Sequence, residues 1–127
     1  MAPSKPPTQR QLRVGEEIRH ILAQSLSLHH SGNALLDRSS ITVTEVRVSP
    51  DFANATVFII PLGGQNFTEI LKALAEMAWF FRKEVARKLT TRVAPRLSFK
   101  ADFSFDQAQR IDSLLRSKKV KDDLGTE

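Results

Sequence analysis

The sequence contains no cysteine among its 127 residues. That absence excludes disulfide bonds, zinc sites built on thiolates and catalysis by a thiol, and it is compatible with a reducing cytosol. No apolar run approaches the ~20 residues that a membrane-spanning helix needs. Residues 1–7 hold three prolines and one lysine but lack the apolar stretch of a signal peptide. We therefore expect a cytoplasmic protein without membrane association.

Residues able to build a catalytic or metal centre are also scarce. The three histidines are His20, His29 and His30, and their spacing matches no metal-ligand pattern. No nucleophile motif is present, and Gly63-Gly64 lacks the Lys-Ser/Thr pair that completes a phosphate-binding loop. We expect no enzymatic activity, no cofactor and no metal ion, and a small hydrolase is the least favoured of three functional hypotheses.

What the sequence does contain is an apolar core and an excess of positive charge. Hydrophobic residues make up 41% of the chain, enough for one folded domain. Nineteen Lys and Arg face fourteen Asp and Glu, which gives a net charge of +5, and the isoelectric point is about 10.0. A small basic domain favours a polyanionic partner, because each neutralised phosphate releases counterions.

The first half of the chain reads as a helix followed by a hairpin. After a disordered arm over residues 1–7, Thr8 and Gln11 form a capping-box pattern that starts a helix running to about Leu26. Residues 27–40 are predicted to be a loop anchored by Leu35 and Leu36. Two strands follow, over 41–48 and 53–60, and the short link makes them antiparallel. The alternation of the first strand slips, which predicts a bulge near Glu45.

The second half reads as a helix, a strand and a short terminal helix. Asn66 and Glu69 are predicted to cap a helix over about 67–90 in the same way as Thr8 and Gln11. Its apolar stripe requires a bend near Met77 to Trp79 if one large aromatic there is to be buried. Residues 97–105 alternate as a strand whose Phe99 and Phe103 face the helices, a short helix begins near Asp106, and 117–127 form a disordered charged tail.

The element order is therefore α-β-β-α-β, which predicts an α+β domain over residues 8–116 with helices on one face of a three-stranded sheet. The candidate RNA-binding residues cluster in its second helix, with two more in the first. Trp79, Lys83 and Arg87 recur every four residues and share a helical face. Cations can contact phosphates and aromatic rings can stack on bases, although exposed Lys and Arg also simply solvate helix surfaces. The full candidate set is Trp79, Arg82, Lys83, Arg87, Lys88, Arg92, Arg10 and Arg13. For Trp79 itself, burial at the bend is preferred to a stacking role.

Three segments together resemble the ribosome-binding factor A family: QRQLRVGEEIRHIL at 9–22, ITVTEVRVSPDFANATVFI at 41–59 and FFRKEVARKLTTRVAPRLSF at 80–99. The resemblance covers roughly residues 8–116. It implies a KH-like fold of the second type, in which an Ala-x-Gly kink separates two halves of a helix. The aligned triplet here is Met77-Ala78-Trp79, with Trp79 in the glycine position. An RNA-binding role for Trp79 would therefore be particular to this sequence.

The resemblance also implies a function. Members of the family are non-catalytic factors that bind the immature 30S small subunit, assist late maturation and 5′-end processing of 16S rRNA, and matter most in the cold. It further implies a monomer that an assembly GTPase helps to release. The alternative hypothesis is a generic KH-like module for single-stranded RNA, which would bind short RNA tightly without a ribosomal subunit.

Overall fold

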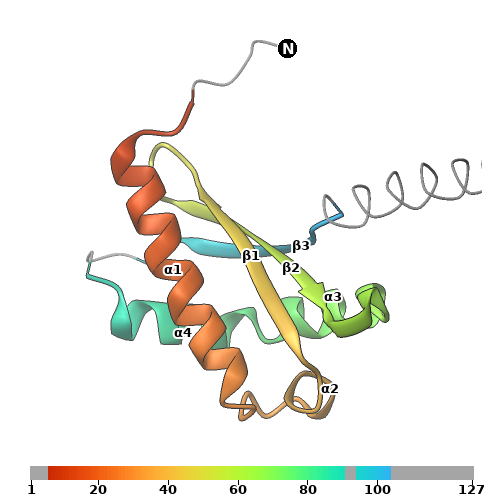
Figure 1. Ribbon diagram of the computed structural model, residues 1–127. Helices are drawn as coiled ribbons and strands as arrows, with labels where there is room; N and C mark the ends of the chain where they lie inside the picture. The colour runs from red at the N-terminus through yellow and green to blue at the C-terminus, as the bar shows by residue number, and fades with distance from the viewer. Residues whose placement is uncertain (1–5, 91–93, 104–127) are drawn as a thin grey trace, which may run out of the picture.

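The computed structural model describes residues 6–90 and 94–103 and shows an α+β domain with one three-stranded sheet (Figure 1). Strands β1 (Ile41–Val48) and β2 (Asn54–Pro61) pair antiparallel, and β3 (Arg96–Ala101) pairs parallel to β2 in the order β1-β2-β3. The predicted terminal helix, the charged tail, Arg92 and the first five residues of the predicted arm lie outside the described residues.

Helix α1 (Gln9–Ser27) begins at the predicted capping box. The Thr8 hydroxyl accepts a hydrogen bond from the Gln11 backbone N–H at 3.1 Å, and the Gln11 side chain accepts one from the Thr8 N–H at 2.9 Å. These bonds satisfy two backbone donors that a helix start otherwise leaves unpaired. The apolar side chains recur at helical spacing and are buried: Val14, Ile18, Ile21, Leu22 and Leu26.

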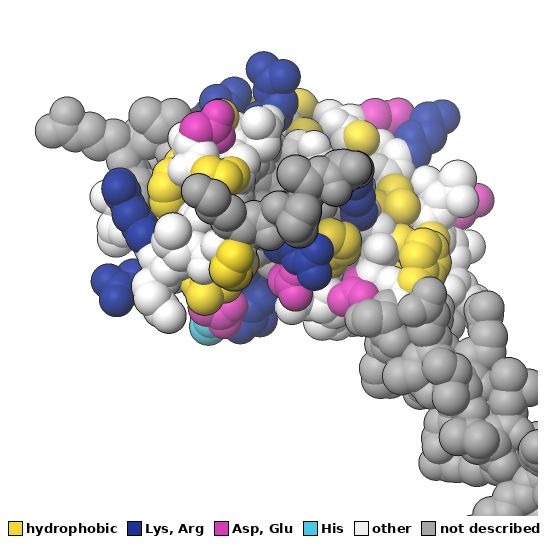
Figure 2. All heavy atoms as spheres, turned by 90° about the horizontal axis from the view of Figure 1, so that it is seen from above, with side chains coloured by type: hydrophobic (Ala, Val, Ile, Leu, Met, Phe, Trp, Pro, Cys, Tyr) yellow, Lys and Arg dark blue, Asp and Glu magenta, His cyan; other side chains and the backbone are white. Residues whose placement is uncertain are grey.

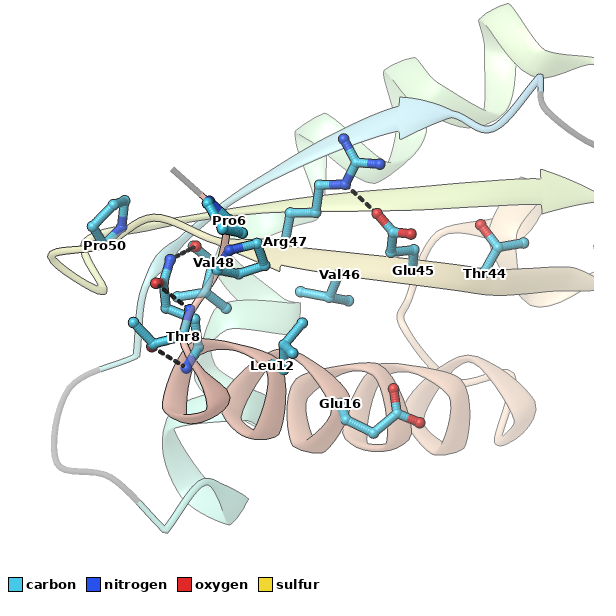
Figure 3. A pocket seen from close by; sticks show the side chains of 12 residues that line it. Pro6, Thr8, Leu12, Glu16, Thr44, Glu45, Val46, Arg47, Val48 and Pro50 are labelled. Atoms are coloured by element: carbon cyan, nitrogen blue, oxygen red, sulfur yellow. Dashed lines mark hydrogen bonds and ion pairs between the residues drawn. The ribbon is translucent and has the colours of Figure 1, made fainter. Parts of the chain in front are cut away.

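Helix α1 also covers part of the outer edge of β1. A Cβ atom on Gly15 would lie 2.6 Å from the Val46 carbonyl oxygen, so only glycine permits this approach. Four residues earlier, the buried Gln11 side chain donates to the Val48 carbonyl at 2.9 Å. Figure 3 shows the start of α1 lying along β1, with the side chain of Val46 directed toward the helix. The helix thereby protects edge carbonyls that could otherwise pair with another chain.

The predicted bulge in β1 is confirmed, because the register with β2 shifts between Val43 and Glu45. The shift lets both Val43 and Val48 face the core despite their opposite phases in the sequence. On β2 the inward residues are Ala55, Val57 and Ile59. Ala53, the first residue of the strand predicted over 53–60, instead lies in the connection between β1 and β2 and is exposed.

Two further local predictions are corrected. Residues 27–40 are not entirely a loop, because Ala34–Asp37 form the short helix α2, capped by the Asn33 side chain, and Leu36 anchors it in the core. Asn66 precedes α3 (Phe67–Glu76) but makes no capping hydrogen bond through its side chain. Its backbone instead adopts the left-handed region at φ 63°, which asparagine tolerates better than most residues.

The long second helix is broken at Met77 into α3 and α4 (Ala78–Lys88), close to where burial required a bend. Leu89, the last residue of the predicted stripe, is buried but already extended, with ψ 140°. Strand β3 is shorter than expected and ends at Ala101. Phe99 packs against Phe81 of α4, whereas Phe103 lies beyond the strand, contacts Phe67 at 5.3 Å between ring centroids and remains 53% exposed.

We predict that Gly15→Ala lowers the free energy of unfolding. Alanine favours helix by ~1 kcal/mol over glycine. However, its methyl group would collide with a backbone oxygen that cannot rotate away, so we expect the upper part of the ~1–3 kcal/mol that overpacking costs. Thermal melting followed by circular dichroism measures the change, with Gln24→Ala on the exposed face of the same helix as control. An unchanged or raised melting temperature would mean that α1 lies farther from β1.

Candidate nucleic-acid interface

The kink between α3 and α4 determines which aromatic side chains reach the core. Met77 has φ −99° and ψ 12°, a conformation open to any L-residue, so the turn needs no glycine. The Met77 N–H donates to the Ala73 carbonyl at 3.0 Å, and the Met77 carbonyl accepts from Phe80 at 3.0 Å. The backbone therefore remains hydrogen-bonded through the change of direction. Helix α4 runs along a different axis from α3, and its residues Phe81 and Val85 are fully buried.

Trp79 is 63% exposed, so the preferred interpretation of the sequence, burial at the bend, is wrong. Phe81 points into the core, and a residue two positions earlier on a helix points about 200° away from it. Phe80 takes the intermediate position and is partly buried. The rings of Trp79, Phe80, Phe81 and Phe99 form an edge-to-face series from the surface to the core, with centroids 5.2–6.1 Å apart. The exposed ring of Trp79 is thus held by packing against Phe80, which in turn packs against the buried Phe81.

Lys83 and Arg87 are both exposed and continue the face of α4 that begins at Trp79. Arg87 donates to Glu84 at 2.6 Å, and the Lys88 ammonium lies 3.9 Å from the same carboxylate. The hydrogen bond from Arg87 lowers the pKa of Glu84, which keeps this carboxylate ionised at neutral pH. Since the Arg87 side chain is still 65% exposed, most of its donors face solvent and can bind an anion.

Arg82 has a structural contact in addition to its exposed position. Its guanidinium donates to the Ala94 carbonyl at 3.3 Å and so connects α4 to the residues that lead into β3. One hydrogen bond uses one of the five N–H donors of arginine, and the others can serve a phosphate.

The two candidate arginines of α1 lie on one side of that helix. Glu17 accepts hydrogen bonds from the backbone N–H of Thr90 at 2.8 Å and from its hydroxyl at 3.1 Å, which fastens α1 to the end of α4. Arg13 lies one turn before Glu17, is exposed, and therefore extends the cationic surface toward α1. Arg10 is another turn away and rests over the ring of Phe52, with its guanidinium carbon 4.9 Å from the ring centroid.

Trp79, Lys83 and Arg87 thus share one exposed face of α4, and the hydrogen bonds between Glu17 and Thr90 hold α1 beside the end of that helix. Arg92 lies outside the described residues. The link between Glu17 and Thr90 joins residues far apart in the chain, and no local pattern in the sequence signals it. A second group of cations, Arg47, Arg96 and Lys100, was not predicted, although the alternation of Arg96, Ser98 and Lys100 with apolar residues was visible in the sequence.

A groove of about 1080 Å³ lies between the start of α1 and β1 and is lined by residues that include Leu12, Glu16 and Val46 (Figure 3). Glu16 lines this groove, and hydrogen bonds from Arg19 and His20 lower its pKa to about 2. An acid of that strength is a poor proton carrier at neutral pH. Within residues 6–90 and 94–103, no three acidic or histidine side chains gather to hold a metal ion, and no helix is long and apolar enough to cross a membrane.

The fold is shared with solved structures of ribosome-binding factor A proteins. The crystal structure of the Thermus thermophilus protein is 22% identical, superposes with a TM-score of 0.60, and covers 72% of this chain and 94% of its own. The solution structure of a putative ribosome binding factor A from Thermotoga maritima is 26% identical, with a TM-score of 0.61 over 76% of this chain and 91% of its own. These likenesses confirm the α+β, KH-like architecture.

Sequence comparison reaches the same group of proteins. Ribosome-binding factor A of Paramagnetospirillum magneticum is 49% identical over 121 residues, which cover 95% of this chain and 85% of that protein. The homologue of that name from Methylobacterium sp. strain 4-46 is also 49% identical, over 95% of this chain and 87% of its own. The profile of the family described as ribosome-binding factor A matches residues 10–115. The chain therefore belongs to the ribosome-binding factor A family.

Proposed function

We propose that the protein is a ribosome assembly factor that binds the small ribosomal subunit through the exposed face of α4. The observation that carries the proposal is the stripe of Trp79, Lys83 and Arg87, which stands out from a rigid helix in a member of this family. Lys and Arg neutralise phosphates, and an exposed indole ring can stack on an unpaired base. Further cations would widen the contact: Arg82, Lys88 and Arg92 from the second half of the chain, and Arg10 and Arg13 from α1.

A complex of this kind is known for a relative. A homology model of Thermus thermophilus ribosome binding factor A has been fitted into a cryo-electron microscopy map of a 30S–RbfA complex, and this chain superposes on it with a TM-score of 0.56 at 22% identity. The likeness concerns the fold. It supports the small subunit as the partner, because the same architecture docks there in that protein.

Membership of the ribosome-binding factor A family supports a finer role. We infer that the bound factor acts in the cytoplasm as a monomer, holds 16S rRNA in a conformation suited to late maturation and 5′-end processing, and matters most in the cold. RNA helices that must rearrange do so more slowly at low temperature, so a protein clamp on one conformation has its largest effect there. We infer that an assembly GTPase helps to release the bound factor.

The alternative function is a generic module for single-stranded RNA. The exposed Trp79 is the observation that favours it, since stacking on a ring tolerates any base. The two functions differ in the ligand that binds best: an assembly factor binds small subunits far more tightly than short RNA. Sedimentation of cell extract through a sucrose gradient distinguishes them, because an assembly factor travels with free small subunits.

Reversing two charges on α4 tests the main proposal. Lys83→Glu with Arg87→Glu replaces two attractions by two repulsions next to phosphates, and we expect small-subunit binding to weaken by at least 100-fold. Both side chains are exposed, so stability changes by no more than ~0.5 kcal/mol for each. Arg38→Glu with Lys72→Glu, two exposed cations elsewhere, changes the net charge equally and serves as the control. Equal losses in both variants would show that net charge, not this surface, drives binding.

Trp79→Ala separates stacking from a structural role. With Trp79 63% exposed, its removal leaves the core intact, so the melting temperature should change little. Loss of a stacked base weakens RNA binding by ~1–3 kcal/mol. Anisotropy of a labelled RNA fragment measures the affinity, and circular dichroism checks the fold. A lower melting temperature with unchanged affinity would make Trp79 a packing residue of the kink.

The salt dependence of binding counts the phosphate contacts. With about four contacts, affinity for small subunits should fall roughly 100-fold between about 50 and 200 mM monovalent salt. The logarithmic slope should become shallower by about two in the Lys83→Glu, Arg87→Glu variant, one for each lost contact. Filter binding across a salt series gives both slopes. A flat response in the unmodified protein would contradict an interface built on cations.

A further inference from the structure

The face of the sheet turned away from the helices carries an ordered pattern of side chains. Val57 and Ile59 of β2 are fully buried, so Phe58 between them points to the opposite, open face. The strand register aligns Glu45, Phe58 and Lys100 in one row across the three strands. The adjacent row is Arg47, Thr56 and Ser98, and Arg96 lies one row farther on, opposite Asn54. This set of residues is called the open-face surface below.

Phe58 is the centre of the open-face surface and is held in a fixed environment. The guanidinium carbon of Arg47 lies 5.1 Å from the centroid of its ring, a cation–π contact. Arg47 also pairs with Glu45, and Figure 3 shows both side chains directed away from α1. Lys100 is the cross-strand neighbour of Phe58 on the other side. An aromatic ring and a guanidinium group are thus pre-positioned together on a rigid sheet.

The charge of the open-face surface is positive, because its three cations Arg47, Arg96 and Lys100 are exposed and its one carboxylate, Glu45, is paired with Arg47. Thr56 and Ser98 add hydroxyl groups that can both donate and accept. At the margin, Thr44 donates to the carboxylate of Asp102 at 2.5 Å. Figure 2, seen from above the view of Figure 1, shows hydrophobic side chains interspersed with Lys and Arg and also with several Asp and Glu.

We propose that the open-face surface is a second RNA-binding site, which takes single-stranded RNA with a base stacked on Phe58 or on the guanidinium of Arg47. Bases stack on aromatic rings and on arginine planes, and flanking cations meet the phosphates. Lys100 lies directly opposite Phe58 on β3, about 4.8 Å away across the strands, and the guanidinium of Arg47 lies over the ring from β1, so cations flank the ring from both neighbouring strands. The core of a protein–protein interface is depleted of Lys, Glu and Ser. Here the ring of Phe58 lies among Lys100, Glu45 and Ser98, which favours RNA over a protein partner.

This site is separate from the α4 surface. Helix α4 packs against the buried face of the sheet, whereas Phe58 and its neighbours project from the opposite face. A protein with both sites can hold two RNA segments at once, and linking two contacts raises the overall affinity without any new interaction. The proposal does not require the α4 surface to be correct, since the open-face surface has its own aromatic ring and its own cations.

The test uses the full chain and a fluorescein-labelled ten-nucleotide oligouridylate, with affinity measured by anisotropy. Phe58→Thr removes the ring but keeps a good strand former, and we expect binding about tenfold weaker. Arg96→Glu with Lys100→Glu should weaken it at least tenfold. Arg38→Glu with Lys72→Glu reverses the same number of charges away from both surfaces and should cost threefold or less. The same variants are also measured in the Lys83→Glu, Arg87→Glu background, where the α4 surface no longer competes for the oligonucleotide, and losses at least as large are expected there.

Binding that is unchanged in Phe58→Thr, or charge reversals on the sheet that cost no more than the control pair, would overturn the proposal. Variants that bind the oligonucleotide normally but lose intact small subunits would indicate a protein contact instead and would also overturn it. Circular dichroism melting verifies the fold, and Phe58→Leu, which keeps apolar packing, replaces the threonine variant if that one is unstable. If the α4 variant binds subunits normally, the proposed function fails while the Phe58 result remains valid.

Discussion

The close contact between Gly15 of α1 and the Val46 carbonyl of β1 sets the depth at which the first helix lies against the sheet. At that depth the buried Gln11 reaches Val48, and Ile18 and Leu22 become fully buried. The same placement puts Glu17 within hydrogen-bond distance of Thr90, at the end of α4. A side chain at position 15 would hold the helix away from the sheet and weaken each of these contacts, because they share one rigid element.

The kink at Met77 is the second constraint, because it decides which aromatic side chains of the two helices enter the core and which one reaches the proposed RNA surface. A straight helix would leave two neighbouring large aromatic residues exposed. Starting α4 on a new axis buries Phe81 completely and Phe80 partly, and leaves Trp79 exposed alone. The edge-to-face contact with Phe80 then fixes the indole position. A preoriented ring loses little conformational freedom when it binds, which benefits affinity.

At both proposed RNA surfaces an arginine forms an ion pair with a nearby glutamate. Glu84 and Glu45 each bind an arginine of a proposed RNA surface, Arg87 and Arg47 respectively, and orient its planar guanidinium. An oriented guanidinium still has donors facing solvent, so each pair prepares a phosphate or base contact at some loss of local positive potential. The net charge of +5 therefore says less about the proposed RNA surfaces than the positions of the individual paired arginines do.

Local interactions let the sequence alone determine the element order, the Thr8 capping box, the β1 bulge and the region of the kink, since each depends on residues a few positions apart. The family was also visible from the spacing of motifs. Only tertiary structure decided that Trp79 is exposed, that Asn66 uses its backbone and not its side chain, and that Phe103 lies outside the core. The meeting of Glu17 with Thr90 and the row of Glu45, Phe58 and Lys100 likewise required the fold. These outcomes depend on which residues far apart in the sequence pack against one another, and a local sequence pattern does not contain that information.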